Sequence, residues 1–180
     1  MAHIPVLKKG GFTLIEVLIV IAIIGLLSTI TVVYVKSARY ESKEKKVLHD
    51  ISQICKAIEV LANDTNRWPG GQPARAVNAA NGNEICPDGC AEGITSSSTG
   101  IIDTDGTFFG WSGPYMDSIP DDPWGRQYFF DTDYLVRPDD KPCAGAGGCV
   151  NAAVLGSYGP NGKGNNSYDS DDIIMVLIKN

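Results

Sequence analysis

The stretch KKGGFTLIEVLIVIAIIGLL, residues 8–27, places two lysines and two glycines directly before a long apolar run. The run extends over residues 12–35 and contains one charged residue, Glu16. A bilayer core needs about 20 predominantly apolar residues in a helix, so the segment is long enough to cross a membrane. The lysines precede the run, which predicts a cytoplasmic N-terminus and a C-terminal bulk on the other side of the membrane.

Two general explanations account for only part of this stretch. A secretory signal peptide has an apolar core of about 7–15 residues followed by a small-residue cleavage site, whereas this core is longer and contains Glu16. A plain N-terminal membrane anchor explains the length of the run. It explains neither the Gly10-Gly11 pair nor the acid.

The same residues resemble the leader and first helix of type IV pilins and pseudopilins. In that family a short basic leader is cut after a glycine and before a Phe, and the fifth residue of the mature chain is an acid. The resemblance implies that a prepilin peptidase removes residues 1–11 by cutting after Gly11, and that Phe12 is then N-methylated. Glu16 is the fifth residue after that cut.

Glu16 also gains a partner in this interpretation. An ionisable side chain inside a membrane normally pairs with another group, and cutting after Gly11 creates an amine on Phe12. The amine can belong to the same helix or to a neighbouring subunit. A pair between subunits would fix their axial register, so we expect Glu16 to act in filament assembly.

The helix is predicted to continue beyond the membrane. The charged segment 36–46 is followed by apolar residues at helical spacing, which indicates one amphipathic face. These residues are Val47, Leu48, Ile51, Ile54, Cys55, Ile58, Leu61 and Ala62. We therefore predict one helix over residues 12–62, with a membrane and assembly half (12–35) and an amphipathic half (36–63).

Residues 64–180 are predicted to form a turn-rich globular domain outside the cytoplasm. Apolar strand candidates are residues 107–111, 127–131, 134–137, 152–158 and 173–179. The last, IIMVLIK, is a continuous β-branched run typical of a central strand. A long helix packed on a small antiparallel sheet makes an α+β fold, and the resemblance implies the type IV pilin fold.

Three further stretches resemble the major pseudopilins of type II secretion systems. They are NDTNRWPGG (63–71), PYMDSIPDDPWGRQYFF (114–130) and GSYGPNGKGNNSYDSDDI (156–173). Their order matches that family over most of the chain, apart from roughly residues 72–110 and 136–152. We interpret Trp124, in the Asp-Pro-Trp-Gly turn, as a structural anchor.

The acidic loop before the last strand is a candidate calcium site. Calcium prefers oxygen ligands in flexible loops, but composition alone favours a solvent-exposed acidic loop, and the spacing is not that of an EF-hand. The resemblance to the major pseudopilins implies calcium here. The implied ligands are the Tyr158 carbonyl, Asn161, Asp169, Asp171 and Asp172, with Asn161 standing where the family usually has Asp.

Four of the five cysteines lie in turn-rich segments, where an oxidising compartment permits disulfides. Local pairing, Cys86 with Cys90 and Cys143 with Cys149, is the favoured one of three possible pairings. Zinc is the rival, although these spacings are not those of common zinc knuckles. Cys55 lies on the apolar helix face, so we expect it to pack as a small hydrophobic residue.

Composition and motifs argue against two broad functions. The net charge of −6 is unfavourable for nucleic acid as the main ligand, because phosphate contacts need clustered Lys and Arg. The histidines are His3, in the leader, and His49, and the sequence contains no recognisable nucleophile, phosphate-loop or zinc-enzyme motif. We therefore expect no enzymatic activity.

The favoured function is that of a structural subunit of a type II secretion pseudopilus. Such a subunit would polymerise with itself, and its partners would be other pseudopilins, an inner-membrane assembly platform and the prepilin peptidase. A type IV pilus subunit for adhesion, motility or DNA uptake is the alternative. A monomeric anchored binding protein, which would form no filament, is the third possibility.

Overall fold

The computed structural model describes residues 10–77, 85–86, 90, 93–145, 147–164 and 167–180. The chain divides into two compact units, Met1–Ser42 and Lys43–Asn180. Helix α1 (Leu14–Thr65) contributes to both units and agrees with the single predicted helix apart from two or three residues at each end. Among the described residues of the second unit, three strands and two short 3-10 helices follow α1.

The described part of the N-terminal unit consists mainly of an apolar helical segment, and its side chains are exposed as far as residue 29. Phe12, Leu14 and Ile15 expose well over half of their surface, and the apolar residues up to Leu27 are exposed as well. By length and composition α1 contains a segment that could cross a membrane, and none of that segment is buried within the chain. Lipid or other protein must cover this surface, because water does not solvate it favourably.

The C-terminal part of α1 buries the predicted apolar face. Val47, Ile51, Ile54, Ile58 and Leu61 are completely buried in the main core. Leu48, which we assigned to the same face, is instead 41% exposed. It follows Val47 directly, and neighbouring helix residues point about 100° apart, so Leu48 lies at the margin of the buried face.

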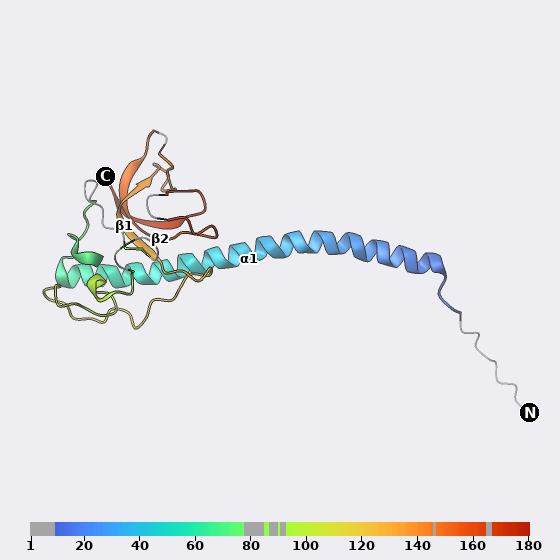
Figure 1. The fold of residues 1–180 in the computed structure, drawn as a ribbon, viewed down its shortest axis with the longest axis horizontal. Helices are drawn as coiled ribbons and strands as arrows, with labels where there is room; N and C mark the ends of the chain where they lie inside the picture. Colours follow the sequence, from blue (N-terminus) through green and yellow to red (C-terminus); the bar gives the residue numbers. More distant parts are fainter. Residues whose placement is uncertain (1–9, 78–84, 87–89, 91–92, 146, 165–166) are drawn as a thin grey trace, which may run out of the picture. The chain divides into compact units, whose positions relative to one another are not determined.

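The sheet consists of three antiparallel strands, β1 (Phe129–Val136), β2 (Val150–Ser157) and β3 (Ile173–Lys179), in the order β1-β2-β3. In Figure 1 the strands lie on one side of the C-terminal part of α1, and the later part of the connection before β1, drawn in yellow, runs along its other side. Phe130, Ala153 and Leu155 face the helix core. The opposite sheet face has a second core that includes Phe129, Tyr134 and Val154.

Two strand predictions require correction. Residues 107–111 form turns rather than a strand, because Gly106 and Gly110 have positive φ values of 90° and 84° that a strand does not accommodate. Strand β3 has the predicted bounds but lies at the sheet edge rather than in the centre. The candidates 127–131 and 134–137 join in β1, with an irregular register between Asp131 and Tyr134.

Helix α1 ends in the predicted turn. Thr65 Oγ1 donates to the Leu61 carbonyl at 2.7 Å, and Asn66 adopts a positive φ of 55°. Trp68 is buried against Phe130, edge to face, with 5.8 Å between the ring centroids. The indole therefore fixes the end of the helix to the sheet.

Candidate functional site

The predicted cleavage site lies in an exposed, non-helical segment. Residues 10–13 precede α1 and are not helical, and Gly10, Gly11 and Phe12 are exposed. A Cβ added at either glycine would contact nothing within 4 Å. The backbone around residue 11 is therefore accessible to a peptidase.

Glu16 takes part in a hydrogen-bonded cap at the start of α1. Its Oε2 accepts hydrogen bonds from the Thr13 backbone N–H at 2.8 Å and from Thr13 Oγ1 at 2.7 Å. In return, the Glu16 N–H donates to Thr13 Oγ1 at 3.4 Å. This reciprocal pattern is a capping box, and it satisfies donors that the first helical turn cannot satisfy by itself. The Thr-x-x-Glu spacing is the sequence signal for such a cap, so Thr13 is a residue that the sequence predictions missed.

Asp172 is the most buried carboxylate of the acidic loop. It is 6% exposed, and its Oδ2 accepts hydrogen bonds from Tyr134 Oη at 2.6 Å and from the Asp169 N–H at 3.3 Å. Its buried Oδ1 has no hydrogen-bond partner among the described residues. Burial raises the pKa of Asp172 to about 7, because a desolvated carboxylate favours its neutral form.

Asp169 and Asp171 form a close carboxyl pair. Asn161 bridges them, with its backbone N–H donating to Asp171 Oδ2 at 3.0 Å and its Nδ2 donating to Asp169 Oδ2 at 2.9 Å. A hydrogen bond between the two carboxyls lowers the pKa of Asp169. Burial and the same shared bond raise the pKa of Asp171. Without a cation, one proton shared by the pair limits the repulsion.

These residues fit a hard cation by their chemistry. Three carboxyl groups crowd one loop, and one of them keeps a buried oxygen atom without a partner among the described residues. As arranged, no three acidic, histidine or cysteine side chains in the described part of the chain are grouped to hold a metal ion. Asn161 presents its amide nitrogen to the aspartates, and the Tyr158 carbonyl accepts the Gly162 N–H at 3.1 Å. Both groups would have to reorient, or accept a second bond, to ligate a cation.

The Asp-Pro-Trp-Gly turn is hydrogen-bonded to the segment where the acidic loop begins. Asp122 Oδ1 accepts the N–H groups of Trp124 and Arg126, both at 2.9 Å, and Oδ2 accepts Ser157 Oγ at 2.6 Å. Arg126 in turn donates to the Gly159 carbonyl. Asp122 therefore joins this turn to the end of β2, where the acidic loop begins.

Trp124 has the predicted structural role, since it is half-buried and packs on the main core. The Lys43 ammonium lies 5.2 Å from its ring centroid. A cation over an indole face is attracted by the ring quadrupole, which adds a contact between this turn and α1.

The structure joins Cys86 to Cys90 and Cys143 to Cys149. These are the local pairs that the sequence favours, and they leave no thiolate among the four for zinc. Cys55 is free and buried, and burial raises the pKa of its thiol to about 12. A thiol with such a pKa stays protonated and unreactive, in agreement with a packing role.

Residues 7–32 match the prokaryotic N-terminal methylation motif. The type II secretion system core protein G of Pseudomonas aeruginosa is 26% identical over 157 residues, which cover 84% of this chain and 96% of that protein. The chain is type IV pilin-like. A probable minor fimbrial protein of Dichelobacter nodosus is 30% identical over 97 residues, 53% of this chain and 61% of that protein. The major pseudopilin from the type 2 secretion system of enterohaemorrhagic Escherichia coli aligns with a TM-score of 0.40 and 22% identity, over 77% of this chain and 86% of that one.

The fold of this type IV pilin-like chain agrees with that relationship. A long N-terminal helix is apolar in its first part and packs its later part on a small antiparallel sheet. The matched motif includes Gly11, Phe12 and Glu16, the three N-terminal residues selected from the sequence.

Proposed function

We propose that the chain is a structural subunit that polymerises into the pseudopilus of a type II secretion system. The observation that carries this proposal is the methylation motif at residues 7–32 in a chain that resembles core protein G over 84% of its length. The extent of that similarity favours the pseudopilus over other pilin-like filaments. The role is structural, without catalysis.

In this proposal the prepilin peptidase cuts after Gly11, and Phe12 becomes the methylated N-terminus. The exposed segment before α1 supports cleavage at this point. The helix anchors the chain in the inner membrane, with a cytoplasmic N-terminus and the globular unit in the periplasm. Assembly then brings copies together with other pseudopilins and an inner-membrane platform.

Glu16 would change partners on assembly. In the uncut chain its carboxylate is bonded to Thr13. Cleavage supplies a cationic amine on Phe12, and the amine of a neighbouring copy would pair with the carboxylate and set the axial register. An unpaired charge in lipid is unfavourable, so this pair would favour the assembled state.

Two substitutions distinguish the role of Glu16 in the helix cap from its role in the charge pair. Glu16→Gln keeps a capping box, since Gln serves at that position, but removes the negative charge. Thr13→Ala keeps the charge and removes the cap hydrogen bonds from Thr13 Oγ1. We expect Glu16→Gln to be inserted and cleaved without forming filaments, and Thr13→Ala to retain filaments. Filaments of Glu16→Gln in normal amount would refute the charge pair.

We also propose that the acidic loop binds calcium through Asp169, Asp171 and Asp172. The crowded carboxyls and the unpartnered Oδ1 of Asp172 support this assignment. A bound cation would neutralise the negative charges of the carboxylates, and its role would be to order the loop before β3. The Tyr158 carbonyl and Asn161 are candidate additional ligands.

A surface pilus is the alternative function, favoured by the similarity to the probable minor fimbrial protein. Deletion of the gene distinguishes the two. Loss of exported enzymes with surface fibres intact supports the pseudopilus. Loss of surface fibres with secretion intact supports the pilus and overturns the main proposal.

A further inference from the structure

Phe109 is a large apolar side chain that the globular unit leaves outside. It is 95% exposed, whereas its neighbour Phe108 is 5% exposed and packs in the core. Among the residues whose burial the structure describes, most large exposed apolar side chains lie in the membrane segment. Phe109 lies far along the sequence from that segment, on the connection before β1.

The turn that carries Phe109 is held firmly. The Trp111 N–H donates to the Phe108 carbonyl at 3.3 Å, and Gly110 has a φ of 84°, a pattern typical of a type II turn with Phe109 at its second position. A Cβ at Gly110 would lie 2.9 Å from the Asp64 carbonyl oxygen, so the turn is seated on the end of α1. Trp111 Nε1 donates to the Gly100 carbonyl at 2.7 Å. These contacts therefore fix the backbone that carries the exposed phenyl ring.

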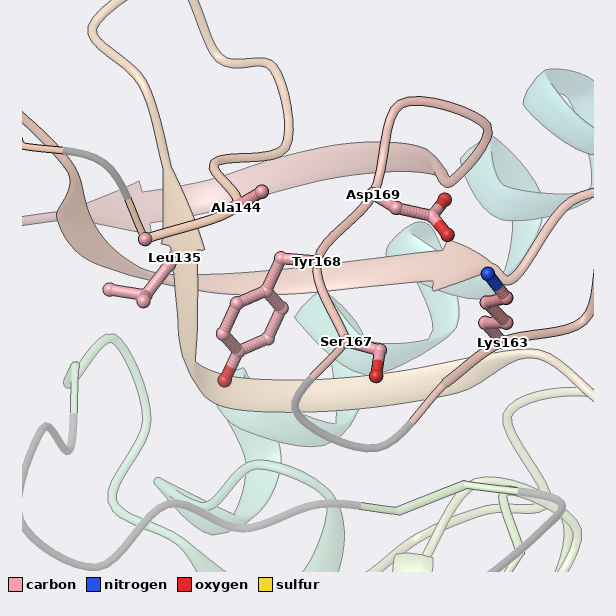
Figure 2. A pocket seen from close by; sticks show the side chains of 7 residues that line it. Leu135, Ala144, Lys163, Ser167, Tyr168 and Asp169 are labelled. Carbon is pink, nitrogen blue, oxygen red and sulfur yellow. The ribbon is translucent and has the colours of Figure 1, made fainter.

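A groove in the same unit can receive such a ring. It has a volume of about 410 Å³, and it lies between the acidic loop and the Cys143–Cys149 loop. Figure 2 shows Leu135 at one end of the groove, Lys163 and Asp169 at the other, and the Tyr168 ring between them.

The charges around the two features are complementary. Asp103 and Asp105 are exposed on the segment that leads to the turn, and the exposed Lys163 lines the groove. Asp169 also lines the groove, but it is one of the carboxylates that we assign to calcium, which would take up its charge.

We propose that Phe109 of one copy of this chain inserts into the groove lined by Leu135, Ala144 and Tyr168 of another copy. The connection that carries the turn and the sheet that carries the groove lie on opposite sides of α1 (Figure 1). The contact is therefore heterologous, and repeated heterologous contacts build an open filament. The proposal rests on the proposed function and assigns to the filament a contact between globular units, separate from the helix contacts at Glu16.

A photo-crosslinker maps the contact directly. The full chain, with p-benzoylphenylalanine at position 109, is assembled into filaments and irradiated. We expect a cross-link to a peptide of a second copy that contains residues 135–145 or 167–169. A cross-link within one copy, to another surface, or only to a different protein overturns the proposal.

Substitutions test the same contact by assembly. Phe109→Ala and the groove-filling Ala144→Trp are each expected to reduce sedimented filament at least tenfold, and the double variant to lose no more than either single variant. Both positions are exposed, so the globular unit keeps its core. Val60→Ala, at another exposed apolar residue, is the control and should assemble normally.

The two proposals fail in different ways. Normal assembly of Phe109→Ala, or additive losses in the double variant, overturns only the contact. A wild-type chain that is cleaved and forms no filament overturns the proposed function, and the contact with it.

Discussion

Asp122 is a buried acidic residue, with 4% of its surface exposed. Its three hydrogen bonds, from Trp124, Arg126 and Ser157, satisfy both oxygens. Asp122→Ala leaves three donors without this acceptor, so we expect unfolding to require about 3 kcal/mol less. Urea denaturation in detergent measures the change. Asp121→Ala, at the exposed neighbouring residue, should stay within about 0.5 kcal/mol of wild type, and equal losses in both variants would contradict the assignment.

The hydrogen bonds of a second carboxylate, Asp64, predict how the stability of the folded chain changes in acid. Hydrogen bonds from Ser112 Oγ and Tyr115 Oη lower the pKa of Asp64 below its ordinary value of 3.8. A lowered pKa means that the folded state binds the proton less readily than the unfolded state. The stabilisation is therefore present above about pH 4 and is lost as the pH falls through the folded-state pKa. Asp64→Asn should flatten the decline in melting temperature below pH 4, and an unchanged acid profile would show that the contact contributes nothing.

Residues with local partners were accessible from the sequence, and those with distant partners were not. Glu16 stands out because a charge interrupts an apolar run, and Thr13 could have been found from the Thr-x-x-Glu spacing. Asp122 could not be found in the same way, because Ser157 lies 35 positions away and only the fold brings the two together. The same limit applies to the Tyr134 hydrogen bond with Asp172.

At the scale of elements, periodicity predicted α1 and the bounds of β3. It did not predict the place of β3 in the sheet. A run of β-branched residues indicates that both faces of a strand are buried, but it does not show whether the strand pairs with a neighbour along both of its edges. Most of β3 is only half-buried. In residues 107–111 the apolar side chains suggested a strand, but Gly106, directly before the segment, and Gly110, within it, determine the backbone.

The connection between β1 and β2 predicts an effect of its disulfide. Cys143–Cys149 closes a short loop within a 13-residue connection. Closing such a loop restricts the unfolded chain, and a loop of this length gives about 2 kcal/mol. Replacing both cysteines by serine should lower the free energy of unfolding by about that amount, measured by urea denaturation. Reductant should then cause a smaller loss in this variant than in wild type, and equal losses would contradict the assignment.

At the scale of the whole molecule, the acidic loop, the sheet and the Asp-Pro-Trp-Gly turn form one connected system. Tyr134 of β1 bonds to Asp172, Arg126 bonds to the loop backbone, and the Tyr158 ring stacks on Phe129 with 4.3 Å between centroids. A cation in the loop should therefore stabilise the globular unit as a whole and not only the loop. Binding to the folded state alone adds about 2.7 kcal/mol at a calcium concentration 100-fold above Kd.

Calcium should raise the melting temperature of the wild-type chain by about 5 °C or more, and chelator should reverse the rise. Asp172→Asn provides a sharp test, because an amide still accepts the Tyr134 hydroxyl and removes a charge from a buried position. Without calcium this variant should be about as stable as wild type, since it removes an unfavourable buried charge but places an amide NH2 group where Oδ1 has no partner among the described residues. It should nevertheless lose the response to calcium. Asp139→Asn, at an exposed acid outside the loop, should respond like wild type. A full calcium response in Asp172→Asn, or no response in wild type, would show that this loop is not the calcium site.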